Sequence, residues 1–309
     1  MNIDEFLDSE IQAQKAGLEK TTSYPGFAGL GFRREMLTDL NQHSDIPVDF
    51  FEIAPENWLS IGGRFAKEIR SYTEKYPFTC HGLSLSVGGY TELDTVLLKN
   101  IKRFMTTHNI ALYTEHLSWC ADDGHLYDLL PIPCTGEAVK WVAQRIQQAQ
   151  EILGMQIGIE NASYYVAPPG ADMSEAEFVS AVVEESGCFL HLDVNNVYVN
   201  SQNFNFDPVS YLASLPLEKV GYVHVAGHFV EDDGLIIDTH GAKVIDPVWT
   251  LLEQTYAMKR FDAANTPACL ERDFNIPALP ELLTEVDKIR QIQTAYASKE
   301  FAPKAHTHA

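Results

Sequence analysis

Eight short apolar segments, each followed by a helix-forming stretch, constrain the fold of this 309-residue chain more than any other feature. Most of the segments are continuously apolar, which is typical of strands buried on both faces of a parallel sheet. Eight strand–helix alternations predict an α/β fold of the (β/α)8 TIM barrel type, which needs about 250 residues. The segments lie at residues 27–32, 48–55, 78–86, 111–118, 156–162, 188–196, 220–228 and 268–274.

Amphipathic patterns predict the helices between these strands. Ser174 with Glu177 forms a capping-box signature at the start of one of them. Nothing resembles an interdomain linker or a repeat, so we expect one barrel domain over residues 27–296. It would follow an N-terminal extension (1–26) and precede a flexible C-terminal tail (297–309). The predicted helices lie at residues 64–75, 92–107, 136–153, 174–186, 207–214, 245–258 and 279–295.

The charge and the cysteine content restrict partners and location. Twenty-two basic against 43 acidic residues give a net charge of −21, which argues against a nucleic-acid partner bound through its phosphates. The five cysteines are odd in number and form no C-x-x-C motif, which favours free thiols in a reducing compartment. With no signal peptide and no apolar run of about 20 residues, we expect a cytoplasmic protein that does not enter a membrane.

Polar side chains gather at the ends of the predicted strands, which in a barrel converge on one mouth. Each of them alone has a structural explanation, such as a helix cap, an ion pair or a turn. Together they place imidazoles and carboxylates at successive ends of apolar segments, where a charge is costly unless it is paired or bound to metal. We therefore predict a metal site at the mouth. The strand-end residues are Glu52, Glu56, His81, Glu115, His116, Glu160, Asn161, His191, Asp193, Asn195, Asn196, His224, His228, Asp238, His240, Glu271 and Asp273.

The residue types narrow the choice of metal. Histidine and carboxylate ligands suit Zn, Fe or Mn, and the lack of clustered thiolates argues against an iron–sulfur centre. The set exceeds the needs of one ion, and carboxylates can bridge neighbouring ions, so we expect two or three metals. We interpret His191, like His43 and His108, as a hydrogen-bonded structural residue. Cys80 lies on the opposite face of the strand from His81, so we expect it to pack in the core.

Seven motifs in this order resemble those of the multinuclear non-haem iron-dependent oxidative enzymes, the family of the methanobactin-biosynthesis oxidases. The resemblance runs from about Gly29 to Asp273. The wider architecture resembles the xylose isomerase-like barrels and the apurinic endonucleases. The motifs are HGLSLSVGG (81–89), TEHLSW (114–119), IENAS (159–163), LDVNNVYVN (192–200), HVAGH (224–228), DTHG (238–241) and LERD (270–273).

The resemblance implies a role for each ligand. His81 and His116 correspond to terminal ligands of one metal, and Glu160 to a bridging carboxylate. The second metal would be held by Asp193, His224 and Glu271. The third would be held by Asp238 and His240, with Asn196 near it. His228 would either bind a metal or hydrogen-bond beside the site. Further contacts to the ligands or the substrate would come from Glu115, Asn161, Asn195, Asp273, Tyr164 and Tyr198.

The function that this resemblance implies is oxidation of a peptide. The enzyme would use O2 and two or three iron ions (Fe2+/Fe3+) to modify cysteine residues of a ribosomally synthesised precursor peptide. Zn or Mn could occupy the site in isolated protein. A separate partner protein would bind the leader of the precursor. The aromatic residues Trp119, Tyr164, Tyr165 and Tyr198 follow site motifs and would either line the peptide groove or pack in the core.

Three alternatives stay open at this point. A divalent-metal-dependent phosphodiesterase of the apurinic endonuclease type would share the scaffold, but that type has a histidine where this chain has Asn196. A sugar isomerase with two divalent ions suits the carboxylates better than the histidines. A metal-storage protein would not need so many strand-end ligands.

Overall fold

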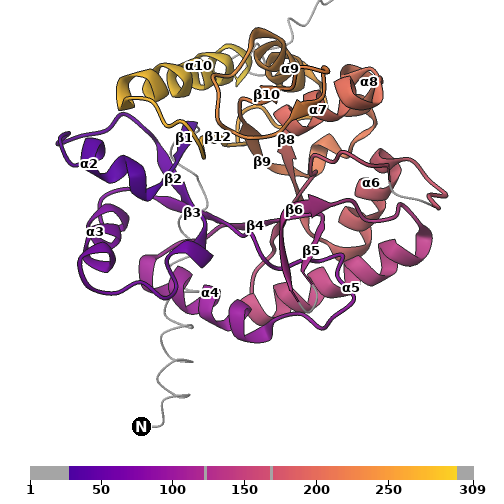
Figure 1. Cartoon of the computed structure of the whole chain (residues 1–309), viewed down its shortest axis with the longest axis horizontal. Helices are drawn as coiled ribbons and strands as arrows, with labels where there is room; N and C mark the ends of the chain where they lie inside the picture. Colours follow the sequence, from indigo (N-terminus) through magenta and orange to yellow (C-terminus); the bar gives the residue numbers. More distant parts are fainter. Residues whose placement is uncertain (1–27, 122–123, 168–169, 298–309) are drawn as a thin grey trace, which may run out of the picture.

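The computed structural model describes residues 28–121, 124–167 and 170–297, and the predicted extension at 1–26 lies outside them. Within the described residues, eight parallel strands close into a barrel in the order β1-β12-β9-β8-β7-β4-β3-β2 (Figure 1). This confirms the predicted (β/α)8 architecture. The barrel strands are β1 (Ala28–Gly31), β2 (Phe50–Ile53), β3 (Phe78–His81), β4 (Tyr113–His116), β7 (Gly158–Glu160), β8 (Phe189–Asp193), β9 (Val220–Val225) and β12 (Ala268–Leu270).

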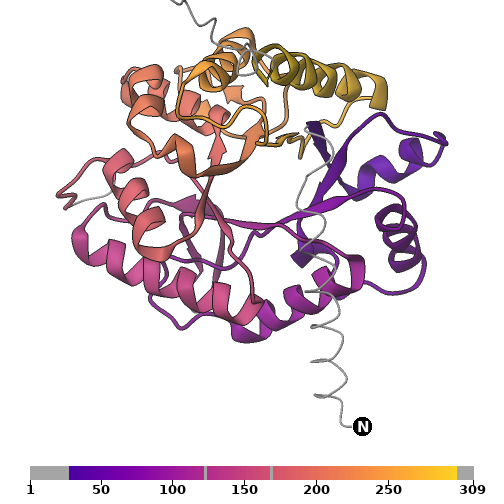
Figure 2. The same cartoon turned by 180° about the vertical axis from the view of Figure 1, so that it is seen from behind.

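Helices surround the strands in the views from both sides (Figures 1 and 2). No helix in the described part of the chain is long and apolar enough to cross a membrane. The α-helices are α2 (Leu37–Leu40), α3 (Gly63–Thr73), α4 (Thr95–His108), α5 (Gly136–Leu153), α6 (Glu175–Ser186), α7 (Val194–Phe204), α8 (Pro208–Ser214), α9 (Asp246–Ala257) and α10 (Leu279–Ala297). Short 3-10 turns are η1 (Arg34–Met36), η2 (Pro55–Asn57) and η3 (Leu217–Lys219).

Local capping explains where several helices begin. The capping box predicted from Ser174 and Glu177 is present at the start of α6. Asp94 caps α4 by accepting from the backbone amides of Val96 and Leu97. Thr135 caps α5 through Ala138. Each side chain satisfies amides that the first helical turn leaves without a partner.

Helix α7 corrects the sequence prediction, which continued a strand to residue 196 and placed no helix between 196 and 207. Strand β8 ends at Asp193, and its carboxylate accepts a 2.6 Å hydrogen bond from the backbone amide of Asn196. This cap turns the chain directly into a helix. The β-branched valines of the segment 194–199 favoured a strand in the sequence, but capping and burial override that preference.

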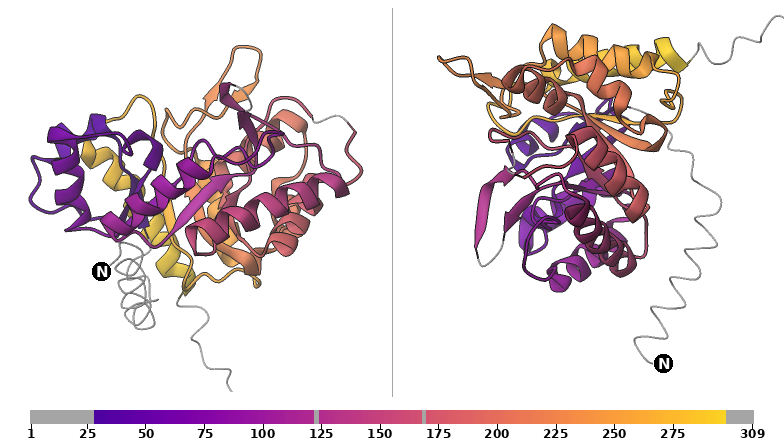
Figure 3. Two further views of the ribbon diagram at one scale, coloured as in Figure 1. Left: turned by 90° about the horizontal axis from the view of Figure 1, so that it is seen from below. Right: turned by 90° about the vertical axis from the view of Figure 1, so that its right-hand side faces the viewer.

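Two hairpins were not predicted. The first, β5 (Trp119–Ala121) with β6 (His125–Leu130), follows barrel strand β4. The second, β10 (Phe229–Val230) with β11 (Ile236–Ile237), follows β9. Both extend from the same side of the barrel in Figure 3. Because they follow the carboxyl ends of their strands, they border the mouth.

The barrel interior has an apolar floor beneath a polar upper layer. Phe50, Leu112, Tyr222 and Cys269 form a buried cluster that is separate from the main core, and Phe189 packs against it. Two residues further along these strands, the inward positions carry Glu52, His191, His224 and Glu271 instead. The period of two in a strand therefore places these four polar side chains at the mouth end. Cys80 lies in the main core, as predicted.

We expect Gly158→Ala to destabilise this floor. A Cβ atom at residue 158 would lie 2.3 Å from the ring of Phe189 and 2.7 Å from Cγ2 of Thr114. Overpacking of this kind costs about 1–3 kcal/mol. The control is Gly136→Ala, where the new Cβ atom would meet nothing within 4 Å. Urea unfolding should show a lower free energy of unfolding for Gly158→Ala than for the wild type. Gly136→Ala should show no such decrease. Equal values for both variants would contradict the packing of the floor.

Candidate metal centre

The strand register brings the predicted ligands to one level of the barrel. His116 is paired with Glu160 across β4 and β7, and Glu160 with His191 across β7 and β8. Asp193 is paired with His224 across β8 and β9. Since parallel strands run in one direction, these residues all lie at the same end. The mouth of the barrel is therefore lined by alternating imidazoles and carboxylates.

The first group of donor atoms is His81, His116 and Glu160. The Nε2 atoms of the two histidines lie 3.1 Å apart. Each lies 3.2 Å from Oε2 of Glu160. That oxygen is buried and has no hydrogen-bond partner in the described structure. Three donor atoms thus converge, and no hydrogen bond compensates for the burial of the carboxylate oxygen.

The second group centres on Nδ1 of His224. This atom lies 3.0 Å from Oε2 of Glu271, 3.2 Å from Oε1 of Glu160 and 4.0 Å from Oδ2 of Asp193. Neither His224 Nδ1 nor Asp193 Oδ2 has a hydrogen-bond partner within the described residues. Glu160 therefore faces both groups, one through each oxygen, as a bridging carboxylate would.

The third group lies in the loop after β9 and at the end of β12. Nε2 of His240 lies 2.8 Å from Oδ1 of Asp238, and Nδ1 lies 3.3 Å from Oε2 of Glu271. Ligand atoms of Asp193, His240 and Glu271 all lie within 4.8 Å of one another. His240 has a left-handed backbone with φ of +49°. This conformation is uncommon outside glycine and is associated with functional sites.

Outer side chains orient the imidazoles by their remaining nitrogens. Nδ1 of His81 is 2.7 Å from Oγ1 of Thr114. Nε2 of His224 lies 2.9 Å and 3.0 Å from the two oxygens of Glu52. Nδ1 of His240 is 3.0 Å from Oδ2 of Asp273. Such contacts fix the ring orientation and leave the other nitrogen free for a metal, the usual arrangement around metal-bound histidine.

Glu115 has the same orienting role for His116. Its Oε1 lies 3.3 Å from Nδ1 of that ring and accepts from the backbone amide of the same residue at 3.0 Å. Its Oε2 accepts from the hydroxyl of Tyr113 and from the amide of Leu85. Glu115 thus ties the loop after β3 to the His116 side of the centre. Glu115 therefore contacts His116, which is itself a predicted ligand.

Arg33 supports the opposite side of the mouth. Its guanidinium donates to Oδ1 of Asp273 at 2.6 Å and to Oε1 of Glu271 at 3.1 Å. Charge-assisted hydrogen bonds of this kind hold the carboxylates in position and favour their charged form. One arginine therefore orients a predicted ligand, Glu271, and the carboxylate behind His240.

Protons are shared unevenly in this crowded site. Burial alone would raise the pKa of Glu160, but the surrounding imidazoles, His191 first, hold it well below its usual range. Burial raises the pKa of Asp193 well above its usual range, and the charges of Glu160 and Asp238 raise it further. The lowered pKa of Glu160 favours its carboxylate form, and the raised pKa of Asp193 favours its protonated form. A bound cation would take the place of that proton.

His191 differs from its sequence interpretation as a hydrogen-bonded structural residue. Its ring is fully buried, 4.0 Å from the ring of His224 and 5.2 Å from that of His81. Neither ring nitrogen has a hydrogen-bond partner in the described structure. Burial and the nearby His224 hold the pKa of His191 well below its usual value.

The amides predicted to lie near the ligands form a network around them. Asn161 donates to the carbonyl of Asp193 and accepts from its amide. Asn196 donates to the carbonyl of Asn161, and its buried Oδ1 has no partner in the described structure. Asn195 donates to Oδ1 of Asp238 at 2.8 Å and lies 2.8 Å from Nδ1 of His228.

His228 therefore reaches the centre through Asn195, which favours its hydrogen-bonding alternative over direct ligation. The ring of Tyr198 stacks on His228 at 5.2 Å. Tyr164 points away from the centre and donates to Glu175 at 2.7 Å. Tyr165 accepts from the backbone amide of Asp238 at 3.0 Å and holds that loop.

The residues present fit a multinuclear metal centre. Buried donor atoms of Glu160, Asp193, His224 and His240 lack hydrogen bonds in the described structure, an expensive state unless something binds there. Imidazole nitrogens and carboxylate oxygens suit Fe, Zn or Mn. The thiol of Cys269 also lies near Glu52 and His224. Burial raises its pKa well above the usual value, which keeps it protonated and a poor ligand.

The sequence is similar to known proteins over most of its length. A family model described as "RiPP precursor modification enzyme MbnB/TglH/ChrH" matches residues 27–294. A UPF0276 protein of Nitrosospira multiformis is 56% identical over 269 residues, which cover 87% of this chain and 94% of that protein. A UPF0276 protein of Shewanella amazonensis is 53% identical over 268 residues, covering 87% of this chain and 95% of the relative.

Solved structures share the fold at low sequence identity. A xylose isomerase-like TIM barrel protein from Mycobacterium smegmatis, in complex with magnesium, matches with a TM-score of 0.57 and 8% identity. The match covers 90% of this chain and 99% of that one. Endonuclease IV from Thermus thermophilus gives a TM-score of 0.55 and 13% identity over 87% and 99% of the two chains. These matches confirm the xylose isomerase-like barrel and extend no further than the fold.

Sequence reasoning placed Glu52 among the strand-end residues without a role of its own, and it singled out neither Thr114 nor Arg33. The signal for Glu52 was its inward parity near the end of the second strand. Thr114 is the first residue of the motif TEHLSW, and the same alternation points its side chain inward. Arg33 lies beyond the end of β1, and nothing local in the sequence indicates its contact with residues 238 and 240 positions away.

We expect His81→Ala and Glu160→Gln to lose bound metal. The first removes a terminal donor and the second weakens the carboxylate that faces two groups of donors. Metal per chain, measured by mass spectrometry after anaerobic purification, should fall by at least one ion in each variant. His43→Ala is the control, because His43 is exposed and lies outside the mouth. A His81→Ala protein with unchanged metal content would show that this ligand assignment is wrong.

We also expect Glu52→Gln to weaken metal binding without removing a donor atom. Glutamine can keep one hydrogen bond to His224 but loses the charge that supports the ring. Changes to such outer partners cost roughly 10–100-fold in metal affinity. Competition with a chelator of known affinity measures the loss. An unchanged affinity would mean that the contact between Glu52 and His224 plays no part in metal binding.

Proposed function

The chain belongs to the MbnB/TglH/ChrH family of RiPP precursor modification enzymes, and on this basis we propose that it is an iron-dependent, O2-using oxidoreductase. Its substrate would be a cysteine residue of a ribosomally synthesised precursor peptide. The observation that carries this proposal is the buried set of unpartnered imidazole and carboxylate atoms at the barrel mouth. Family membership supports a peptide substrate, and the site offers donor atoms that would hold a redox-active metal.

Two or three iron ions would occupy the three groups of donors. His81, His116 and Glu160 would hold one ion, and Asp193, His224 and Glu271 a second. Asp238 and His240 would hold a third, with Asn196 beside it. Bound iron would supply the redox chemistry by which electrons pass from the cysteine residue to O2. Zn or Mn could replace iron in isolated protein, since the same donors suit them.

The chain's own residues would prepare the site for a thiolate. A cysteine thiol binds metal well only after it loses its proton. The carboxylates around the mouth repel any approaching anion. A thiolate can therefore approach only where cations offset the negative charge of those carboxylates. Arg33 offsets part of the charge at Glu271 and Asp273. The apolar floor beneath His191 and His224 keeps bulk water from entering the centre from below.

Exposed apolar side chains around the mouth support contact with a peptide. The hairpins and the loop after β7 present Leu126, Val166, Phe229 and Val230, and Phe274 follows β12. Clustered exposed apolar residues typically mark a binding surface. The precursor peptide would lie across this rim, and a separate partner protein would bind its leader. We expect the reaction to take place in the cytoplasm, where free cysteines stay reduced.

The test is joint production of this chain with a short cysteine-containing peptide encoded beside its gene, together with any adjacent leader-binding protein. We expect a mass change confined to a cysteine-containing fragment. The change should need both O2 and iron. A peptide with serine at that cysteine and a Glu160→Gln enzyme are the matched controls, and both should give unmodified peptide.

Other outcomes would contradict the proposal. Modification under strict exclusion of O2, or by protein loaded only with zinc, would indicate chemistry without redox cycling. Mössbauer spectroscopy of protein grown on iron-57 gives an independent measure. It should show two or three irons per chain with an antiferromagnetically coupled pair. A protein that takes up no iron under anaerobic conditions would exclude the oxidase.

A further inference from the structure

A cavity of about 170 Å³ lies beside the candidate metal centre, and none of the proposed metal ligands lines it. Its wall includes Leu117 and Asn161, which directly follow the proposed ligands His116 and Glu160. Consecutive Cα atoms are about 3.8 Å apart, so the cavity begins one residue from the centre. A peptide that presents one side chain to the metals can therefore place a neighbouring side chain here.

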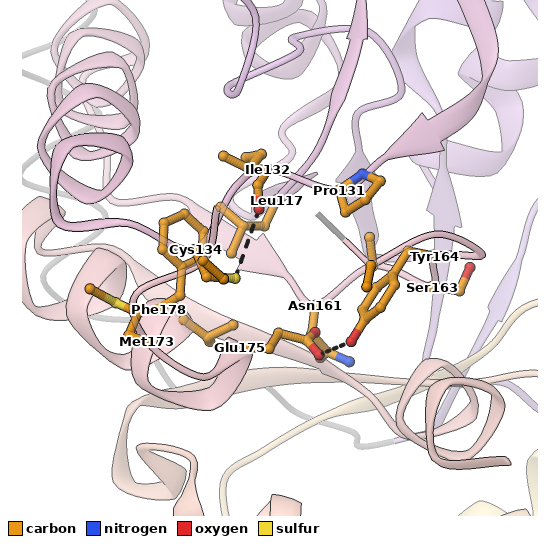
Figure 4. Close-up of a pocket in the computed structure, with 14 residues that line it drawn as sticks. Leu117, Pro131, Ile132, Cys134, Asn161, Ser163, Tyr164, Met173, Glu175 and Phe178 are labelled. Atoms are coloured by element: carbon orange, nitrogen blue, oxygen red, sulfur yellow. Dashed lines mark hydrogen bonds between the residues drawn. The ribbon is translucent and has the colours of Figure 1, made fainter. Parts of the chain in front are cut away.

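Most of the wall is apolar. Figure 4 shows Met173, Cys134 and Phe178 on one side and Tyr164 on the other, with Ile132 between them. An apolar cavity of about 150 Å³ is large enough to admit benzene. The size therefore suits a single side chain, and the apolar wall suits its methylene groups.

One ionisable carboxyl breaks this apolar surface. Glu175, the first residue of α6, points toward Tyr164 and accepts a 2.7 Å hydrogen bond from its hydroxyl (Figure 4). The hydroxyl of Tyr211 lies near the same carboxyl. Burial raises the pKa of Glu175 to about 7, although the hydrogen bond from Tyr164 lowers it. Because this pKa is close to neutral pH, a positively charged neighbour would lower it and so ionise the carboxyl.

The other polar groups of the wall are already engaged. Asn161 uses its amide on the backbone of Asp193, and Ser163 donates to Asp238. The charges nearest the cavity are negative: Glu175 and Asp172 act with burial to raise the pKa of Cys134 to about 11. An apolar occupant would bury the carboxyl without a counter-charge, which is costly. A cationic occupant would remove that cost.

We propose that this cavity binds the side chain of a lysine one or two residues from the reacting cysteine. Its methylene stem would pack against Met173, Phe178 and Ile132, and its ammonium would pair with Glu175. The cysteine in this statement rests on the proposed function, whereas recognition of the ammonium does not. The cavity would thereby set which cysteine of a peptide enters the centre.

A direct test uses n-butylammonium as the probe and 1-butanol as its neutral counterpart. Methyl NMR of the zinc-loaded protein, with signals from Met173, Ile132 and Val179, reports binding in the cavity. We expect saturable shifts with n-butylammonium that are stronger at about pH 8 than at about pH 6, because Glu175 ionises between them. Glu175→Gln should weaken this binding by about tenfold or more and leave 1-butanol unchanged.

Two further variants guard this test. Glu184→Gln, on the exposed face of α6, should bind both probes like the wild type. Met173→Trp fills the cavity and should abolish binding of both, as seen at Ile132. Equal binding of the two probes by the wild type, or n-butylammonium binding unaffected in Glu175→Gln, would overturn the proposal. Should Glu175→Gln fail to fold, the charge preference and pH dependence of the wild type still decide.

Selection of random decapeptides on the iron-loaded protein separates this inference from the proposed function. Enrichment of cysteine with lysine one or two positions away, and loss of the lysine with Glu175→Gln, supports both. Cysteine enriched without a neighbouring lysine leaves the function standing and overturns the cavity proposal. Lysine enriched without cysteine does the reverse. Arginine or an apolar residue in place of lysine also overturns the cavity proposal.

Discussion

The buried carboxylate of Glu160 is the interaction on which the rest of the site depends. One oxygen faces His81 and His116, and the other faces His224. A carboxylate so far from water stays ionised only because imidazoles surround it. Those imidazoles in turn keep their orientation through Thr114, Glu115 and Glu52, so charge and geometry are set together. Removing one member would leave its neighbours with buried charge that nothing offsets.

The barrel can tolerate this crowding because it separates stability from chemistry along the strands. The lower inward positions pack rings such as Phe50, Phe189 and Tyr222 into a dry floor. The upper positions carry the donors, which cost stability without a bound cation. The hairpins after β4 and β9 then extend the mouth without altering either layer (Figure 3). A packed floor under a layer of donor atoms is suited to holding several metals at short separations.

The metal centre and the side-chain cavity share a wall, and this links the two proposals. The residues after His116 and Glu160 turn from the centre to the cavity within a single peptide unit. A peptide bound at both would be fixed at two adjacent points, one through its sulfur and one through a charge. Orientation of this kind contributes to rate as well as to choice of substrate, because the reacting group is held in position before the reaction.

The sequence by itself determined the barrel and the residue types at its mouth, because strand and helix periodicities and inward parity are local properties. Eight strands, seven of the helices and the positions of His81, His116, Glu160, His224 and Glu271 at one mouth could be predicted in this way. Helix α7 could not, since a cap by Asp193 outweighed the strand preference of its valines. Nor could the contacts of Glu52 with His224 or of Arg33 with Glu271, which join residues 172 and 238 positions apart. The unpartnered ring of His191 and the charged cavity at Glu175 were likewise decided by closure of the barrel, because burial and the approach of distant charges exist only in the folded chain.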